Sequence, residues 1–250
     1  MARIFITGSA DGLGQLAATS LIQQGHKVVL HARNAERAHD AIKKNPEAES
    51  VFTGDLSNIE ETKNLAYEVN KSGTFDTVIH NAGVYKTSAK HVFAVNTLAP
   101  YILTCLIQKP KRLIYLTSGM HLQGRFKPEH FKIDMSHITY ADTRLHVLIL
   151  CMAVARIWTD VYSNAVNPGW VPTKMGGRGA PDDLQKGYET QVWLAVSNDE
   201  KAKTSGRYFF HQKEKQHNRE ADDIQIQERF LKLCKEITGV TFPLYQHTEI

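Results

Sequence analysis

Cysteine is scarce in this chain, because only Cys105, Cys151 and Cys234 occur among 250 residues. They lie far apart and match no metal-ligand spacing, so we predict no metal site. An odd count on apolar segments favours reduced thiols packed in the core of a cytoplasmic protein. Long apolar runs are also missing, and Met1 leads directly into a strand-like segment. The sequence therefore predicts neither a membrane span nor a signal peptide.

Charge of one sign is not concentrated anywhere in the chain. Thirty lysines and arginines face 26 acidic residues, and the net charge of +4 is mild. The basic residues are spread along the sequence, which argues against nucleic acid as a partner. A small-molecule anion would fit this balance, and so would a slight excess of surface lysine. With 42% hydrophobic and 22% charged residues, the composition is that of a globular protein.

Short apolar runs alternate with segments of helical periodicity at the spacing of strand–helix–strand units. Predicted strands cover Arg3–Thr7, Lys27–His31, Ser50–Thr53, Thr74–His80, Arg112–Thr117, Tyr162–Val166 and Gly206–Phe210. Predicted helices cover Gly12–Gln24, Asn34–Lys44, Ser57–Lys71, Ser88–Ile107, Ile138–Ile157, Pro181–Val196 and Ile224–Ile237. We expect Ser57 and Glu60 to form a capping box, and Pro100 to kink or break its helix. The alternation predicts an α/β fold with a parallel sheet covered by helices on both faces.

The whole chain, residues 1–250, is expected to form one domain. Residues 174–190, around the start of the helix Pro181–Val196, and residues 212–223 are predicted to be substrate-side or peripheral loops. Gly119–His137 is a third segment outside the core. Residues 174–190 and Gly119–His137 follow strands, so we expect them at the carboxyl edge of the sheet, where such folds bind ligands.

A glycine-rich turn, Thr7-Gly8-Ser9-Ala10-Asp11-Gly12-Leu13-Gly14, joins the first strand to the first helix. The pyrophosphate of a dinucleotide needs a tight turn, an uncovered backbone and a helix N-terminus. Gly8 suits the turn, Gly12 the approach of phosphates, and Gly14 the close packing of helix on strand. An ordinary glycine-rich turn is the alternative, but the context indicates a Rossmann-type doubly wound fold. The predicted cofactor contacts in this turn are Gly8, Ser9, Asp11, Gly12, Leu13 and Gly14.

An acidic residue is missing at the end of the second strand, where one would bind the ribose 2′-hydroxyl of NAD(H). The sequence there is His31-Ala32-Arg33-Asn34. The planar donor fork of Arg33 would instead pair with a 2′-phosphate. We therefore predict NADP(H) as the preferred cofactor, with NAD(H) possible, and the alternative is a solvated arginine at a helix start.

The spacing TGxxxGxG resembles that of the short-chain dehydrogenase/reductase family, and further segments agree in order between Arg3 and Thr173. The stretch that follows Thr117-Ser118 resembles members that reduce retinal and related lipophilic carbonyls. The resemblance implies an aspartate near the adenine, a turn after the fourth strand, and a proline–glycine segment beside the nicotinamide. The corresponding residues are Asp55, Leu56, Asn81, Ala82, Gly83, Pro168, Gly169, Val171 and Thr173.

The same resemblance implies four catalytic residues. Tyr140 would be the general acid and base, Ser118 the hydrogen-bond donor to the substrate oxygen, and Asn96 the holder of a helix kink and a water relay. The fourth residue should be a lysine one helical turn after the tyrosine, but the sequence has Arg144. Arginine keeps the charge, yet its bulkier guanidinium is never deprotonated, so a lysine proton relay would not transfer intact.

Two functions follow from these residues. The first is an NADP(H)-dependent oxidoreductase that interconverts a small-molecule carbonyl and its alcohol. The second is an NADP(H)-binding sensor whose catalysis is weak or lost because of Arg144. A sugar-nucleotide epimerase is a minor third reading, since too little chain follows the sixth strand for a separate substrate domain. By analogy with the family, a homodimer or homotetramer is expected.

Overall fold

A computed structural model of the chain describes residues 1–131 and 135–244. Within these residues the strands form one eight-stranded sheet of order β3-β2-β1-β4-β5-β6-β7-β8. All neighbours pair in parallel except β7 and β8. The strands are β1 Arg3–Ile6, β2 Lys27–Ala32, β3 Ser50–Thr53, β4 Thr77–His80, β5 Arg112–Leu116, β6 Tyr162–Asn167, β7 Arg207–Phe210 and β8 Lys213–Glu214.

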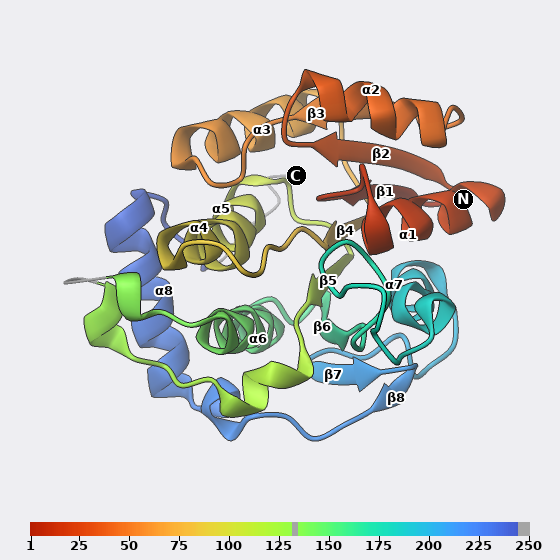
Figure 1. Cartoon of the computed structure of the whole chain (residues 1–250). Coiled ribbons are helices and arrows are strands. Elements are labelled where there is room, and N and C mark those ends of the chain that lie inside the picture. Colours follow the sequence, from red (N-terminus) through yellow and green to blue (C-terminus); the bar gives the residue numbers. More distant parts are fainter. Residues whose placement is uncertain (132–134, 245–250) are drawn as a thin grey trace.

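Helices cover both faces of this sheet, as predicted. They are α1 Gly12–Gln23, α2 Ala35–Lys44, α3 Ile59–Lys71, α4 Ala89–Phe93, α5 Ala99–Leu106, α6 Tyr140–Ile157, α7 Leu184–Val196 and α8 Ile224–Thr238. Buried side chains of α1, α2 and α7 form one hydrophobic core, and those of α3, α5, α6 and α8 form the other. Figure 1 shows α6 and α8 on one side of the strands and α1 and α7 on the other. The Rossmann-type, doubly wound α/β prediction is confirmed.

The long helix predicted over Ser88–Ile107 is interrupted. A π-helical turn, Ala94–Leu98, separates α4 from α5, and Pro100 lies at the start of α5. Proline has no N–H, so the carbonyl of Asn96, four residues earlier, lacks its α-helical donor. Widening the turn at this point accommodates the missing donor. The expected kink or break is therefore a change of helix type just before the proline.

The capping box predicted for Ser57 and Glu60 is not formed. The N-cap of α3 is Asn58, whose Oδ1 accepts hydrogen bonds from the N–H groups of Glu60 and Glu61. Ser57, the predicted cap, lies one residue too early and bonds to Asp55 instead. The reason is that asparagine caps as well as serine, and the sequence pattern did not distinguish the two positions.

The segments predicted to be loops are more regular than expected. Residues 174–190 contain the first turns of α7, which begins at Leu184 with Asp183 as its cap. Residues 212–223 contain β8 and a 3₁₀ helix, Arg219–Asp222. Strand β8 pairs antiparallel with β7 through a tight connection in which His211 and Gln212 have φ values of 49° and 59°. A two-residue strand is too short to give a periodic signal in the sequence.

Candidate active site

A cleft of about 540 Å³ opens at the carboxyl edge of the parallel strands, where the order of the sheet reverses between β1 and β4. Its lining includes residues from the turns after β1, β2, β3, β4 and β6, together with the start of α6. Fourteen of the predicted site residues lie in it: Gly8, Asp11, Gly12, Leu13, Arg33, Asp55, Leu56, Asn81, Ala82, Gly83, Tyr140, Arg144, Pro168 and Thr173. Outside its lining are Ser9, Gly14, Asn96, Ser118, Gly169 and Val171.

The glycine-rich turn fits the pyrophosphate of a dinucleotide. Gly8 and Gly12 have φ values of +64° and +55°, which side chains rarely adopt. A Cβ on Gly8 would come within 2.9 Å of the Cα of Ala82, and one on Gly14 would collide with the amide of Asn81. A Cβ on Gly12 would project toward Thr173 at 3.8 Å, into the cleft. The turn thus leaves backbone exposed at the N-terminus of α1, where anions bind.

Ser9 does not face this cleft. Its side chain is fully buried, and its hydroxyl donates to the carbonyl of Ile6 at 3.0 Å and accepts from the N–H of His31 at 2.9 Å. Residues Gly8 and Asn81 are linked nearby, because the Asn81 Nδ2 donates to the carbonyls of Thr7 and Gly8. These polar contacts join the turn to the neighbouring strands.

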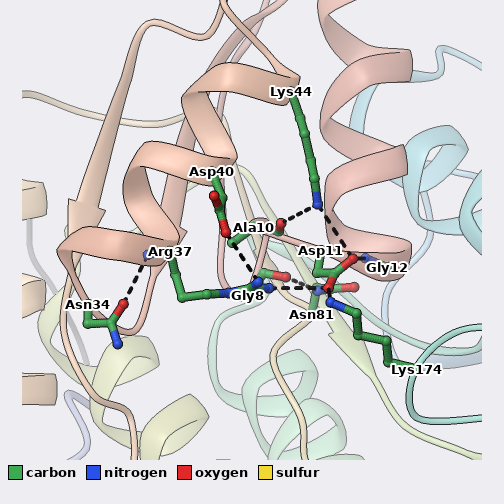
Figure 2. A network of polar contacts seen from close by, with 10 residues as sticks. All are labelled: Gly8, Ala10, Asp11, Gly12, Asn34, Arg37, Asp40, Lys44, Asn81 and Lys174. Atoms are coloured by element: carbon green, nitrogen blue, oxygen red, sulfur yellow. Dashed lines mark hydrogen bonds and ion pairs between the residues drawn. The ribbon is translucent and has the colours of Figure 1, made fainter.

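Three cations surround the carboxylate of Asp11, as Figure 2 shows. Arg37 and Lys44 reach it from α2 at 3.2 and 3.6 Å, and Lys174 reaches it from the loop after β6 at 2.5 Å. Lys44 also donates to the carbonyl of Ala10. Segments far apart in the sequence thus bring positive charge to one edge of the cleft.

The charge state of Asp11 follows from these partners. Partial burial alone would raise the pKa of its carboxyl group. Hydrogen bonds from Lys174, the N–H of Gly12 and Arg37, with the charge of Lys44, outweigh that effect and lower the pKa below its ordinary value. Asp11 is therefore ionised at neutral pH, and it cancels only part of the positive charge around it.

Arg33 also lines the cleft. Its side chain is exposed, and its charge contributes to the lowered pKa of Asp55. Burial opposes that shift, and hydrogen bonds from Ser57 and the charge of His91 assist it. Leu56, next in the chain, is buried with 7% exposure and supplies an apolar wall. The predicted adenine side of the cleft therefore combines an ionised carboxylate with an apolar surface.

Tyr140 and Arg144 lie one turn apart on α6 and both reach the cleft. The guanidinium carbon of Arg144 is 4.7 Å from the centre of the Tyr140 ring, so the cation packs over the ring. Its Nη1 donates to the carbonyl of Leu116 at 3.1 Å, and the group is 97% buried against Gly83. The Tyr140 ring also packs against Tyr85, with ring centres 4.7 Å apart.

Asn96 and Ser118 lie outside the lining of the cleft, unlike Tyr140 and Arg144. Asn96 lies in the π-helical turn with 1% exposure, and its amide bonds to both backbone groups of Val84 and to the Thr143 hydroxyl. Ser118 caps the 3₁₀ helix Gly119–Gln123 by accepting from the N–H of Met120 at 3.3 Å. Asn96 is therefore a hydrogen-bonded core amide and Ser118 a turn cap, whatever further role each has.

The segment after β6 closes one side of the cleft. Gly169 has a φ of +85°, and a Cβ there would come within 2.7 Å of the Asp182 carboxylate. Val171 is buried with 4% exposure and packs toward Gly187 on α7. Pro168 and Thr173 face the cleft. The buried Val171 and the tight turn at Gly169 therefore position the other two residues.

Several cleft residues were missed by the sequence reasoning. Arg37 and Lys174 line the cleft, and Lys44 contacts Asp11 at its edge. The three are scattered in the chain, and nothing in their spacing marks them as neighbours. His31 was noted only as part of the segment before Arg33. Of the three cations, Arg37 alone lies close in the chain to a predicted phosphate-binding residue, since it follows Arg33 by four positions. Also in the lining are Ala10, Ala32, Val84, His91, Val95, Leu116, Thr117 and Met175.

The cysteines lie in the core of the protein. All three cysteines are unpaired and buried, as predicted. Burial raises the pKa of the Cys151 thiol to about 12, so it is protonated at neutral pH. In the parts of the chain that the structure describes, no helix combines the length and apolar character that crossing a membrane requires.

Comparisons with known proteins agree with this geometry. The sequence model of the short chain dehydrogenases matches residues 2–109. An uncharacterized oxidoreductase of Emericella nidulans is 47% identical, over 97% of this chain and 99% of its own. The short-chain dehydrogenase chyC of Penicillium rubens is 40% identical, over 97% of this chain and 100% of its own. Retinol dehydrogenase 14 of Mus musculus is 23% identical, over 95% and 86% of the two chains.

A solved structure shares the fold. A protein of Escherichia coli crystallised with NADPH superimposes with a TM-score of 0.67, covers 85% of this chain and 97% of its own, and is 24% identical. That likeness concerns the fold, whereas the relatives above share sequence along nearly the whole chain. The family resemblance inferred from the motifs is thereby confirmed, and the chain belongs to the short-chain dehydrogenase family of oxidoreductases.

Proposed function

We propose that the protein is an NADP(H)-dependent oxidoreductase that interconverts an aldehyde or ketone with its alcohol, using Tyr140 as general acid and base. One observation carries the proposal: a single cleft holds the glycine-rich turn, a group of cations and the Tyr140 ring. The relatives in the oxidoreductase family support the reaction class. The E. coli neighbour with NADPH supports the cofactor class.

The cofactor, when bound, supplies or accepts the hydride. The exposed backbone from Gly12 at the start of α1 would hold the pyrophosphate. Arg33 and Arg37 flank the same edge of the cleft, and their planar donor forks suit the 2′-phosphate that distinguishes NADP(H) from NAD(H). Leu56 and Asp55 would meet the adenine.

Proton transfer is assigned to this chain's own hydroxyl groups. In the direction of reduction, the Tyr140 hydroxyl donates a proton to the carbonyl oxygen of the substrate. The Ser118 hydroxyl accepts from Met120 and so keeps its own hydrogen available to donate to that oxygen. The Arg144 guanidinium lies over the phenol ring and opposes the negative charge left on Tyr140.

The test pairs cofactor binding with turnover. Wild-type protein should take up NADPH in calorimetry and consume it with at least one member of a panel of aldehydes and ketones. Tyr140→Phe should lower turnover by about 100-fold or more while changing NADPH affinity by less than about threefold. Tyr67→Phe, on the exposed face of α3, is the matched control and should be fully active. Equal activity of Tyr140→Phe and the wild type would refute the role of Tyr140.

A second candidate, the NADP(H)-binding sensor, is favoured by the position of Arg144. Its guanidinium packs over the ring of Tyr140, and its Nη1 donates to the carbonyl of Leu116 and not to the phenol oxygen. If the arginine impairs an enzyme, Arg144→Lys should raise turnover by about tenfold or more, because lysine restores the missing relay. Tight NADPH binding without turnover in both proteins would favour the sensor instead.

A further inference from the structure

We propose that His31 is the positioning residue that holds the dinucleotide-binding turn in shape, a role that rests on the proposed function for its consequence in cofactor binding. His31 is the penultimate residue of β2, lines the cleft and touches the segments that carry the glycine-rich turn and the predicted adenine contacts. No pattern in the sequence distinguishes it from an ordinary strand-end histidine.

The imidazole connects two backbone segments that are 46 residues apart. Its Nδ1 is 2.9 Å from the N of Gly8, and its Nε2 is 3.0 Å from the O of Gly54. A backbone N–H donates and a carbonyl accepts, so the ring has to accept at Nδ1 and donate from Nε2. Both contacts are satisfied by one neutral tautomer. Nδ1 as acceptor therefore faces a donor, and Nε2 as donor faces an acceptor.

The backbone of His31 binds the same turn. Its N–H donates to the Ser9 hydroxyl at 2.9 Å, and its carbonyl accepts from the N–H of Ser9 at 3.1 Å. Together with the imidazole, these bonds hold two consecutive residues of the turn from one position on β2. The buried Ser9 hydroxyl, which does not face the cleft, thus has a structural use here.

Gly8 is held at both of its backbone polar groups. His31 accepts from its N–H, and the Asn81 amide donates to its carbonyl at 3.1 Å. Gly8 has a left-handed φ of +64°, one of several conformations open to glycine, so these two contacts help to select it. When this peptide is already fixed, cofactor binding loses less conformational entropy in ordering the turn.

The surroundings keep the ring in the neutral form that these contacts require. His31 is 98% buried, and burial lowers its pKa to about 4, while the Gly54 carbonyl and the charge of Asp55 act in the opposite direction. The ring of Phe5 on β1 meets it edge-on, with centres 6.5 Å apart. At neutral pH, the Nδ1 acceptor is therefore available to Gly8.

Three substitutions of His31 test its contacts with Gly8 and Gly54 separately. Asn places its Oδ1 one bond from Cγ, as Nδ1 is, and retains an acceptor for Gly8. Gln reaches as far as Nε2 and retains a donor for Gly54, but not the acceptor for Gly8. Phe keeps the ring shape and removes both contacts. The matched control is His146→Phe, which replaces another buried histidine of lowered pKa in an aromatic cluster of the α6–α8 core.

The first measurement is the dissociation constant of NADPH at pH 7.5 for folded protein. We expect His31→Asn to stay within about threefold of the wild type, and His31→Gln and His31→Phe to weaken binding by about tenfold or more. His146→Phe should lower the melting temperature without this loss of affinity. Wild-type affinity in His31→Phe, or equal weakening in the Asn and Phe variants, would overturn the proposal.

The second measurement needs no cofactor. Amide hydrogen exchange at Gly8 should become about tenfold faster in His31→Phe and His31→Gln, and return toward the wild-type rate in His31→Asn. Exchange in α8 should not change. If wild-type protein takes up no NADPH but exchange follows this order, the proposed function fails while the anchoring role of His31 stands. Unchanged exchange at Gly8 in His31→Phe would refute the anchoring role itself.

Discussion

The carboxylate of Asp11 contacts three cations at one edge of the cleft. It neutralises part of the positive charge of Arg37, Lys44 and Lys174, and its lowered pKa is the thermodynamic counterpart of those contacts. Because these ion pairs are only partly buried, each contributes little stability by itself. Their main effect is to gather positive charge where an anionic ligand would enter.

Cofactor preference can be tested at the scale of single residues. Arg33→Asp should weaken NADPH binding by about tenfold or more and improve NADH binding, because it replaces a partner of the 2′-phosphate with an acceptor for a 2′-hydroxyl. Affinities for both dinucleotides are measured by fluorescence titration. Arg229→Asp, an exposed arginine on α8, is the control and should change neither. An unchanged preference in Arg33→Asp would remove the argument for NADP(H).

Individual elements position the site through their ends and interruptions. The π-helical turn places Asn96 where its amide holds both backbone groups of Val84, next to the cleft segment Ala82–Gly83. The capping box of Thr139 and Asp142 begins α6 immediately before Tyr140. Thus the start of one helix and the irregular turn in another determine where the predicted catalytic side chains lie.

The cap of α3 gives a prediction at the scale of an element. Asn58→Ala should lower the free energy of unfolding by about 1 kcal/mol, because two N–H groups at the helix start lose their acceptor. Ser57→Ala should lower it by clearly less, since Ser57 interacts with Asp55 and does not cap the helix. Denaturant unfolding of both variants provides the comparison. A larger loss in Ser57→Ala would restore the assignment expected from the sequence.

Buried histidines affect the stability of the whole molecule. Burial lowers the pKa of His31 to about 4 and those of His80 and His146 to about 3. An unfolded chain would protonate each near its ordinary pKa of about 6.5, so it binds more protons than the folded chain below that pH. The contribution of these histidines to the free energy of unfolding is therefore complete above about pH 6.5. It is lost as the pH falls toward their pKa values in the folded protein.

We accordingly expect the free energy of unfolding to fall between pH 6.5 and pH 4. Well inside that window, the slope should approach about 1.4 kcal/mol per pH unit for each histidine. His146→Phe should reduce the slope by about one histidine's share, because one proton fewer is taken up on unfolding. Urea unfolding at a series of pH values measures it. A flat profile across this window in the wild type would contradict the prediction.

Sequence reasoning was most successful where one segment carried its own signal. The turn around Gly8 and Gly12 was predicted because glycine spacing, strand and helix follow each other directly in the chain. Tyr140 and Arg144 were paired because they lie one helical turn apart. The strand bounds coincide with the predicted ones or differ by one residue, except that β4 begins three residues later. Strand β8 was missed because two residues carry no periodicity.

The amino-acid sequence by itself determined the alternating strands and helices, the family motifs and the departure at Arg144, because these depend on neighbours along the chain. Only the tertiary structure decided that Lys174 meets Asp11, that His31 holds Gly8, and that Arg144 lies over the ring of Tyr140. The first two contacts join residues brought together by the parallel crossovers of the sheet, and the third depends on the Leu116 carbonyl, which holds the guanidinium from a neighbouring strand. Local propensity does not encode such meetings, since the distance between two strand ends depends on how the whole core packs.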